Sequence, residues 1–221
     1  MVRNYNKRSE KDYGLIRSIG FKAFINFVVC PVSKLLYDIK VEGRENVPRK
    51  RSNIIVAGNH VSYLDPPMIS YAVGRRIAFM GKKELFESPN LLLRTLCISL
   101  GGFAVNREKP ELATFKTVKA IFNTPWLLGI FPQGGIRKEP VLNNIAKGFT
   151  LFSKKFKADV LPVAVCGFDG YSKWFFQKHM TIKIGKIISH ELSDEEIVKE
   201  WAKQICEMTG FENKVEEQLT D

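Results

Sequence analysis

Short apolar runs rich in β-branched residues alternate along the chain with segments of helical periodicity, and this alternation is the strongest constraint on the fold. The clearest run, 53–58 (NIIVAG), is apolar at consecutive positions and ends in glycine, which is typical of a buried strand. Further strands are predicted at 77–80, 102–105, 126–131, 160–166 and 181–188, and helices at 110–123, 146–156 and, apart from Pro89, 86–100. Strands that alternate with helices form a mainly parallel sheet flanked by helices on both faces, so we predict an α/β fold.

A capping box predicts the last helix of the chain. Ser193 is followed three residues later by Glu196, and the two side chains can each bond the backbone of the other's turn. An apolar stripe follows at Ile197, Trp201, Ile205 and Met208. No internal repeat or long linker interrupts the pattern, so residues 38–221 are predicted to form one α/β domain.

The net charge of +11 is distributed unevenly along the chain. Residues 1–51 carry +7, residues 52–190 carry +11, and residues 191–221 carry −7. So basic a protein binds something anionic: nucleic acid, an anionic membrane or a phosphorylated substrate. The acidic end favours a locally positive face or pocket over a protein that coats a polyanion.

Four scattered cysteines, without a C-x-x-C pair, argue against a zinc knuckle and a secreted disulfide framework. A reducing cytosol fits this usage.

Residues 12–37 combine aromatic and aliphatic side chains with Arg17, Lys22 and Lys34. Such a segment forms either a helix packed on the core or a helix in a membrane interface, with its cations against anionic headgroups. Lys22 and Lys34 interrupt the apolar run and no small-residue cleavage site follows, which excludes a signal peptide. No transmembrane span is expected either, because the longest stretch without charged residues, 120–136, is broken by prolines and glycines.

His60 directly follows the first buried strand, and Asp65 lies five residues further on. Ligands of parallel sheets bind at the carboxyl ends of the strands, so these positions are candidates for chemistry. In a turn entering a helix, Asp65 can fold back onto the imidazole, fix its tautomer and stabilise the imidazolium that forms when His60 accepts a proton. Taken alone, the pattern also fits a capped helix start with an incidental histidine.

Two further strand ends each present an arginine. Arg107 follows the strand at 102–105, and Arg137 follows the glycine-containing turn after the strand at 126–131. The planar guanidinium suits a phosphate, and the glycines allow close approach of the backbone. Together with His60, these residues describe a site that deprotonates a hydroxyl on a phosphorylated molecule.

Four blocks of sequence carry a resemblance to the 1-acylglycerol-3-phosphate acyltransferase (glycerolipid acyltransferase) family. In chain order they are Asn59-His60-x-Ser62-x-x-Asp65, Lys82-x-Glu84-Leu85 with residues 102–107, Phe131-Pro132-Gln133-Gly134-Gly135-Ile136-Arg137, and Leu161-Pro162-Val163. The resemblance spans roughly residues 40–190. It implies transfer of a fatty acyl group from acyl carrier protein or acyl coenzyme A to the free hydroxyl of 1-acylglycerol-3-phosphate, giving phosphatidic acid in phospholipid biosynthesis.

The resemblance also implies a role for each site residue. His60 would be the general base and Asp65 its orienting partner. The lysophospholipid acceptor would be bound by the remaining residues, namely Lys82, Arg107, Gln133, Gly134, Gly135, Arg137 and Pro162, with Pro162 in the pocket wall. The reaction needs a positioned base and oxyanion donors but no metal or resident cofactor, since the thioester is a co-substrate.

One block departs from the family pattern. Gln133 occupies the position of a family glutamate and Gly135 that of a threonine. A neutral amide can still hydrogen-bond but supplies no charge. Acylation of another lysolipid or of glycerol-3-phosphate by the same mechanism is therefore the alternative.

The family's membrane-bound substrates favour the interfacial interpretation of the N-terminus. We predict a membrane-interface helical segment over residues 1–37, an acyltransferase domain over 38–221, and peripheral or monotopic attachment to the cytoplasmic face of the cell membrane. An inactive membrane-bound relative is conceivable because of Gln133, but His60, Asp65, Arg107 and Arg137 are intact. Nucleic-acid binding is not expected, because no nucleic-acid module is recognised and the aromatic residues lie mostly in apolar runs.

Overall fold

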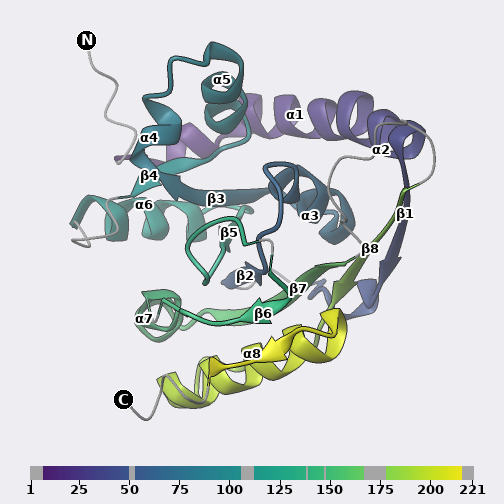
Figure 1. Cartoon of the computed structure of the whole chain (residues 1–221). Helices are drawn as coiled ribbons and strands as arrows, with labels where there is room; N and C mark the ends of the chain where they lie inside the picture. Colours follow the sequence, from purple (N-terminus) through teal and green to yellow (C-terminus); the bar gives the residue numbers. More distant parts are fainter. Residues whose placement is uncertain are drawn as a thin grey trace.

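The computed structural model describes residues 7–49, 53–105, 112–137, 139–146, 148–166 and 178–215. In this part of the chain, seven strands form one sheet in the order β1-β8-β7-β2-β5-β3-β4 (Figure 1). The strands are β1 (Tyr37–Glu42), β2 (Ile54–Gly58), β3 (Ile77–Lys82), β4 (Phe103–Val105), β5 (Leu127–Ile130), β7 (Asp159–Cys166) and β8 (Lys178–Ile184). Neighbours from β7 to β4 pair in parallel, whereas β8 runs antiparallel to β7 and carries β1 parallel to itself. The predicted α/β fold with a mainly parallel sheet is confirmed.

Helices lie on both sides of this sheet, with α1 and α3 on one side and α8 on the other in Figure 1. The α-helices are α1 (Leu15–Phe24), α2 (Cys30–Leu36), α3 (Asp65–Val73), α4 (Lys83–Phe86), α5 (Leu91–Ser99), α6 (Leu112–Phe122), α7 (Gly148–Phe156) and α8 (Asp194–Thr209). Shorter elements are the 3₁₀ turns η1 (Glu10–Tyr13) and η3 (Arg44–Asn46), the π-helical η2 (Ile25–Val29), and a small sheet of β6 (Val141–Leu142) and β9 (Glu212–Asn213).

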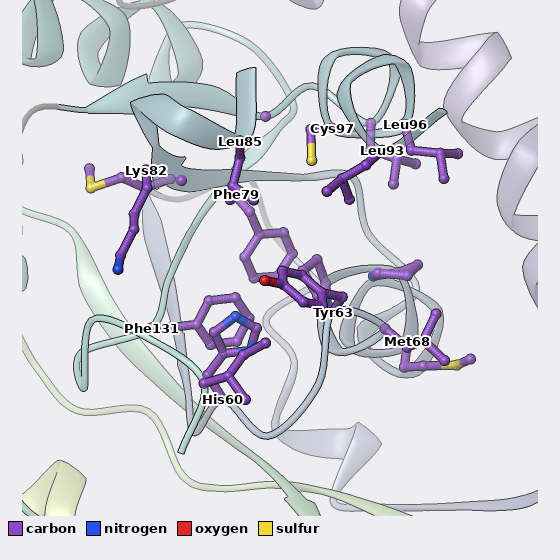
Figure 2. Close-up of a pocket in the computed structure, with 18 of the residues that line it drawn as sticks. His60, Tyr63, Met68, Phe79, Lys82, Leu85, Leu93, Leu96, Cys97 and Phe131 are labelled. Carbon is purple, nitrogen blue, oxygen red and sulfur yellow. The ribbon is translucent and has the colours of Figure 1, made fainter. Parts of the chain in front are cut away.

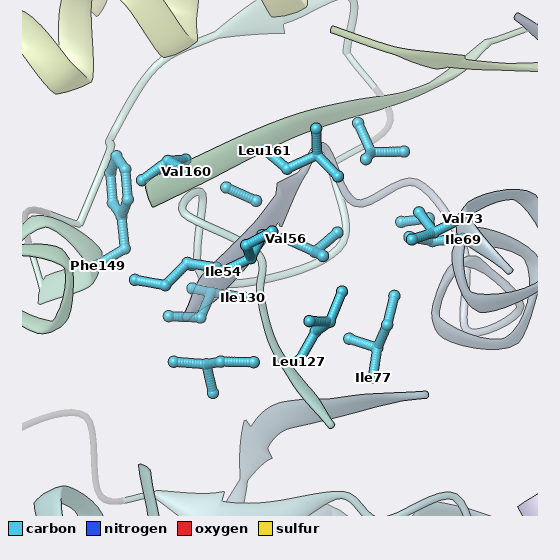
Figure 3. Close-up of a cluster of buried hydrophobic side chains, with 14 of the residues drawn as sticks. Ile54, Val56, Ile69, Val73, Ile77, Leu127, Ile130, Phe149, Val160 and Leu161 are labelled. Atoms are coloured by element: carbon cyan, nitrogen blue, oxygen red, sulfur yellow. The ribbon is translucent and has the colours of Figure 1, made fainter. Parts of the chain in front are cut away.

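The core is centred on β2, whose five residues are all buried. Apolar side chains from β2, β3, β5, β7, α3 and α7 meet around it (Figure 3). On the α8 side, Trp201 is fully buried and its indole Nε1 donates to the Ala57 carbonyl at 3.0 Å. The predicted capping box of α8 is present, with Ser193 and Glu196 each bonding the other's backbone. These contacts hold the carboxyl end of β2, from which the candidate site begins.

Two predicted elements differ from the structure. The helix predicted over 86–100 begins only at Leu91, as α5, because Pro89 cannot occupy a helix interior and Asn90 caps α5 by accepting from the Leu93 amide at 3.1 Å. The predicted strand at 181–188 is β8, which ends at Ile184. Ile188 instead forms an isolated antiparallel bridge with Val160.

Strand β1 and the small β6–β9 sheet lie outside the predicted strands. β1 is an edge strand in which Tyr37, Ile39 and Val41 alternate with charged residues and pack partly on the core. A period of two was therefore present in the sequence, but it is too short and too polar to stand out from the surrounding helical pattern.

The N-terminal segment is one long helical run from α1 through η2 to α2. The π-helical turn precedes Pro31, whose ring would clash with the carbonyl of the preceding turn, and the Cys30 amide bonds back to Ile25 across the widened turn. One side of this run is buried: Phe21 packs edge-on against Trp126 at a centroid distance of 5.0 Å, and Ser18 Oγ accepts from Trp126 Nε1 at 3.1 Å. The segment therefore packs against the core as well as presenting a free face.

The other side of the run is what we call the exposed apolar face. It consists of Leu15, Ile16, Ile19, Phe27, Val28, Val32 and Leu35, of which Ile16 is 89% exposed and Phe27 79%. Contrary to the expectation of no spanning segment, Glu10–Val32 is long and apolar enough to cross a membrane by length and composition alone. Core helices and signal sequences share these two properties, so they do not by themselves assign a spanning role.

Candidate active site

The loop between β2 and α3 builds a buried histidine–aspartate pair. Asp65 is the first residue of α3, where a carboxylate is stabilised by the helix dipole and where the following prolines fit the first turn. Its Oδ2 accepts from His60 Nδ1 at 2.7 Å and from the backbone amides of Val61 at 2.7 Å and Ser62 at 2.8 Å. The loop thus wraps around one carboxylate oxygen, and Asp65 is only 1% exposed.

This geometry determines what His60 can do. A carboxylate oxygen that already accepts two amide bonds favours the tautomer in which Nδ1 carries the proton, so Nε2 has a free lone pair. No hydrogen-bond partner for Nε2 occurs among the described residues, and the His60 side chain is 15% exposed. Phe131 stacks on the imidazole at a centroid distance of 3.9 Å and an interplanar angle of 12°, which fixes the plane of the ring. Nε2 is therefore positioned to accept a proton from a ligand.

An apolar cavity of about 350 Å³ opens beside His60 (Figure 2). Its walls come from the N-terminal helical run, the start of α3, strand β3 and helices α4 and α5. The lining includes Phe24, Val29, Met68, Phe79, Leu93, Leu96, Cys97 and Phe131. In Figure 2, His60 and Phe131 lie at one end of the group and Leu93, Leu96 and Cys97 of α5 at the other. A cavity of this size and composition suits a hydrocarbon chain with one end at the imidazole.

The glycine-containing turn lies directly against His60. Gly134 has a φ of 70°, a left-handed conformation that glycine adopts without strain, and its amide donates to the Phe131 carbonyl at 2.9 Å. The Arg137 amide donates to the His60 carbonyl at 2.7 Å, which joins this turn to the histidine loop. Gly135 lines the apolar cavity, and the Arg137 side chain is exposed. The structure therefore brings two of the predicted sequence blocks together.

Lys82 and Gln133 have different surroundings. Lys82 is exposed at the end of β3 and lines the rim of the apolar cavity, where Figure 2 shows its extended side chain. Gln133 is buried, and its amide Nε2 donates to the Val141 carbonyl at 3.3 Å. The side chain of Gln133 thus ties the turn to β6.

Of the predicted site residues, His60, Lys82 and Gly135 line the apolar cavity. Pro162 lies within β7, in register with Ala57, and its carbonyl accepts from the Gly185 amide at 2.9 Å. Pro162 does not line the apolar cavity, because the fourth block forms a buried central strand, and its role in a pocket wall stays a prediction. Arg107 lies outside the described residues.

The acyltransferase family model matches residues 38–166, which include every predicted site residue. The chain belongs to the acyltransferase family. Among curated members, the 1-acyl-sn-glycerol-3-phosphate acyltransferase of Borreliella burgdorferi is 29% identical over 190 residues, covering 82% of this chain and 73% of that protein. The chloroplastic enzyme LPAT1 of Arabidopsis thaliana, of the same name, is 24% identical over 133 residues, covering 59% of this chain and 36% of that protein.

A solved acyltransferase structure shares the fold. The 1-acyl-sn-glycerophosphate (LPA) acyltransferase PlsC of Thermotoga maritima superimposes with a TM-score of 0.69 at 25% identity, covering 87% of this chain and 79% of that one.

Sequence reasoning missed two residues that position the acyltransferase site. Phe131 was included in a motif without a role, yet it stacks on His60 and in turn on Phe79 at 5.2 Å. Asn59 is fully buried, and its amide accepts from the Val165 amide at 2.8 Å and donates to the Val165 carbonyl at 3.0 Å. A buried side-chain amide needs hydrogen-bond partners for both its NH₂ group and its oxygen. An asparagine directly after a buried strand could therefore have been identified from the sequence as a structural residue.

A second histidine–aspartate pair shows that the bond alone does not make a site. His190 Nδ1 lies 2.7 Å from Asp159 Oδ1, the same separation as in the His60 pair. Asp159, however, is the first residue of β7 and lies at the amino-terminal ends of the parallel strands, opposite their carboxyl ends. Neither residue lines the apolar cavity. Of the two pairs found among the described residues, only the His60 pair therefore faces a ligand-sized space.

Proposed function

We propose that the protein is a 1-acylglycerol-3-phosphate O-acyltransferase that converts lysophosphatidic acid to phosphatidic acid. The observation that carries the proposal is the placement of His60, with its free Nε2, at one end of an apolar cavity and beside the Arg137 turn. The family membership and the names of the relatives agree with this function. The acyl donor is a thioester of acyl carrier protein or of coenzyme A.

In the proposed mechanism, Nε2 of His60 removes the proton from the acceptor hydroxyl as its oxygen attacks the thioester carbonyl carbon. Asp65 stabilises the imidazolium through the Nδ1 bond, without itself taking the proton. The tetrahedral intermediate then collapses: the carbon–sulfur bond breaks, and the imidazolium returns the proton to the departing thiolate. The products are an ester, a free thiol and His60 in its starting state.

The fatty acyl chain occupies the apolar cavity in this proposal. Burying a methylene contributes about 0.8 kcal/mol, so a chain that fills the cavity contributes several kcal/mol to binding. Phe131 and Phe79 form a stacked wall that leads from His60 into the cavity. The thioester carbonyl would then lie at the imidazole, where the chain ends.

Cys97 offers a test of this chain site, because it lines the cavity on α5, away from His60. Cys97→Phe should shorten the accepted chain, with a loss of about fourfold in kcat/KM for each methylene that no longer fits. Competition between thioesters of different length, with products read by mass spectrometry, measures this. Cys97→Ala enlarges the site and is the matched control. An unchanged chain-length profile in Cys97→Phe would place the acyl chain elsewhere.

The acceptor phosphate is bound by cations around the Gly134 turn. Arg137 and Lys82 are the two among the described residues, and Arg107 is a further predicted partner. Gln133 does not weaken this assignment, since its buried amide donates to the Val141 carbonyl, a bond that a carboxylate could not make. Its neutrality therefore removes no charge from the exposed rim.

Arg137→Ala should raise the acceptor KM about tenfold or more with a smaller effect on kcat, because a charge-assisted bond to phosphate is lost. Initial rates at varied lysophosphatidic acid measure the split. Lys199→Ala, which removes an exposed cation from α8, is the control for net charge. If the acceptor KM stayed at the wild-type value, Arg137 would have no contact with the phosphate.

The decisive experiment is an acyl-transfer assay with the purified protein. Both donors are supplied with a panel of lysophosphatidic acid, other lysolipids and glycerol-3-phosphate, and products are identified by mass spectrometry. Preferred acylation of lysophosphatidic acid is expected. Preference for another acceptor would keep the mechanism and change the substrate.

The protein is proposed to act as a peripheral or monotopic protein at the cytoplasmic face of the cell membrane. The support is the exposed apolar face of the N-terminal run, next to which Leu91 and Leu92 of α5 are also largely exposed. The same helical run lines the apolar cavity through Phe24, Val28 and Val32. A membrane on this face would supply the lysophospholipid next to the site.

A further inference from the structure

A second cavity, which we call the basic cavity, lies on the other flank of the N-terminal helical run. It is formed by α1, η2, η3 and the end of α3, and its lining includes Lys22, Arg44, Arg75 and Arg76 but no acidic residue. Its volume is about 580 Å³. Four cations without a carboxylate in one concavity attract an anion.

None of these four cations forms an ion pair within the described part of the chain. Arg44 donates to the carbonyls of Ala72 at 2.9 Å and Tyr71 at 3.4 Å, and Arg75 donates to the Pro48 carbonyl at 3.0 Å. These bonds hold two guanidinium groups in place, yet each guanidinium has five N–H donors and most of them are left unused. The guanidinium groups are therefore held in fixed positions, and they keep N–H donors that are free to bind an anion.

Arg76 is the cation of this group that most needs a bound acceptor. Its Nε is buried and has no hydrogen-bond partner among the described residues. Burial, together with the positive charge of Arg75, lowers the pKa of Arg76. A buried donor without an acceptor is unfavourable, and an anion bound in the cavity would supply the acceptor and offset the repulsion.

The basic cavity is distinct from the candidate active site. Lys82, at the end of β3, lines the apolar cavity, whereas Arg75 and Arg76 precede β3. The six residues of β3 span about 20 Å, too far for one phosphate to contact both places. The two cavities nevertheless share a wall, since Phe24 and Val28 line one while Phe21 and Lys22 line the other.

We propose that the basic cavity is a phosphate-binding site separate from the catalytic centre, and that an anionic phospholipid headgroup supplies the phosphate. Ile19 of the exposed apolar face lies one helical turn before Lys22, so acyl chains along that face place a headgroup at the cavity. The source of the phosphate rests on the membrane association proposed above. A headgroup held there orients the N-terminal run so that the apolar cavity also adjoins the bilayer.

Co-sedimentation with vesicles tests the lipid source. Lys22→Gln and Arg76→Gln should each weaken binding to phosphatidylglycerol-containing vesicles about fivefold, the usual contribution of one cation near an anionic surface, and leave binding to pure phosphatidylcholine unchanged. Lys203→Gln, on α8 at the far side of the sheet, removes the same charge and should change neither. Lys22 is exposed, so its variant should fold even if Arg76→Gln does not.

Phe27→Ser separates failure of this proposal from failure of membrane association. It removes an aromatic side chain from the exposed apolar face and should weaken binding to both kinds of vesicle. If the wild-type protein bound neither vesicle, the proposed membrane association would be wrong and the headgroup source with it. If the wild-type protein bound both kinds of vesicle but Lys22→Gln and Arg76→Gln behaved as Lys203→Gln does, only the lipid headgroup as the source of the phosphate would be overturned.

Inorganic phosphate tests the site without a membrane. The experiment uses Arg137→Ala, which removes the phosphate contact proposed for the active site. Phosphate should raise the melting temperature of this variant, and adding Lys22→Gln or Arg76→Gln should abolish the increase. An increase with no effect of these variants on vesicle binding would assign a soluble phosphate in place of a lipid. No dependence on Lys22 or Arg76 in either assay would overturn the phosphate site.

Discussion

Replacing His60 with alanine should lower kcat by roughly 100-fold to 10,000-fold, the usual contribution of a general base. The acceptor hydroxyl is a very weak nucleophile until its proton is removed, and Nε2 of His60 is the one basic atom that the described residues place at the end of the apolar cavity. The backbone bond from Arg137 to the His60 carbonyl does not involve the imidazole and should survive the substitution. Initial rates with saturating lysophosphatidic acid and thioester measure the effect.

His190→Ala provides a matched control for this loss. It removes an imidazole that has the same 2.7 Å bond to an aspartate but lines no part of the apolar cavity. Its turnover should stay within about twofold of wild type, because surface substitutions far from the chemistry change little. Near-normal turnover of folded His60→Ala, checked by circular dichroism, would remove His60 from the mechanism.

The sequence allowed the His60–Asp65 pair to be predicted because the pair is local. Six consecutive residues between a buried strand and a helix start have few conformations, and Asp65 satisfies two amides of its own loop as well as the imidazole. Local bonds of this kind depend little on the rest of the fold. The same holds for the Gly134 turn and for the capping box of α8.

The apolar cavity could not be predicted in the same way, because its walls come from segments far apart in the chain. Phe24, Leu96 and Phe131 are brought together only by the order of strands in the sheet and by the path of the N-terminal run. Side-chain direction was a second obstacle. Gln133 follows a strand end in the sequence, yet its side chain is buried and bonds the Val141 carbonyl.

Asp65→Asn should lower kcat by about 100-fold to 10,000-fold with little change in the acceptor KM, although Asp65 touches no substrate. All three partners of Oδ2 are donors, and an amide oxygen in that place can still accept from them. The amide carries no charge, however, so the imidazolium that forms during proton transfer loses its counter-ion. If the amide flips, its NH₂ group opposes Nδ1 and favours the wrong tautomer of His60.

The double variant distinguishes this positioning role from general damage to the fold. Because Asp65 acts through His60, Asp65→Asn should reduce the rate little further when His60 is already alanine, as residues that act as a unit are not additive. Asp159→Asn makes the same change in the His190 pair and should leave kcat unchanged. Losses that multiplied in the double variant would mean that Asp65 supports the site by a route independent of the imidazole, such as the loop amides of Val61 and Ser62.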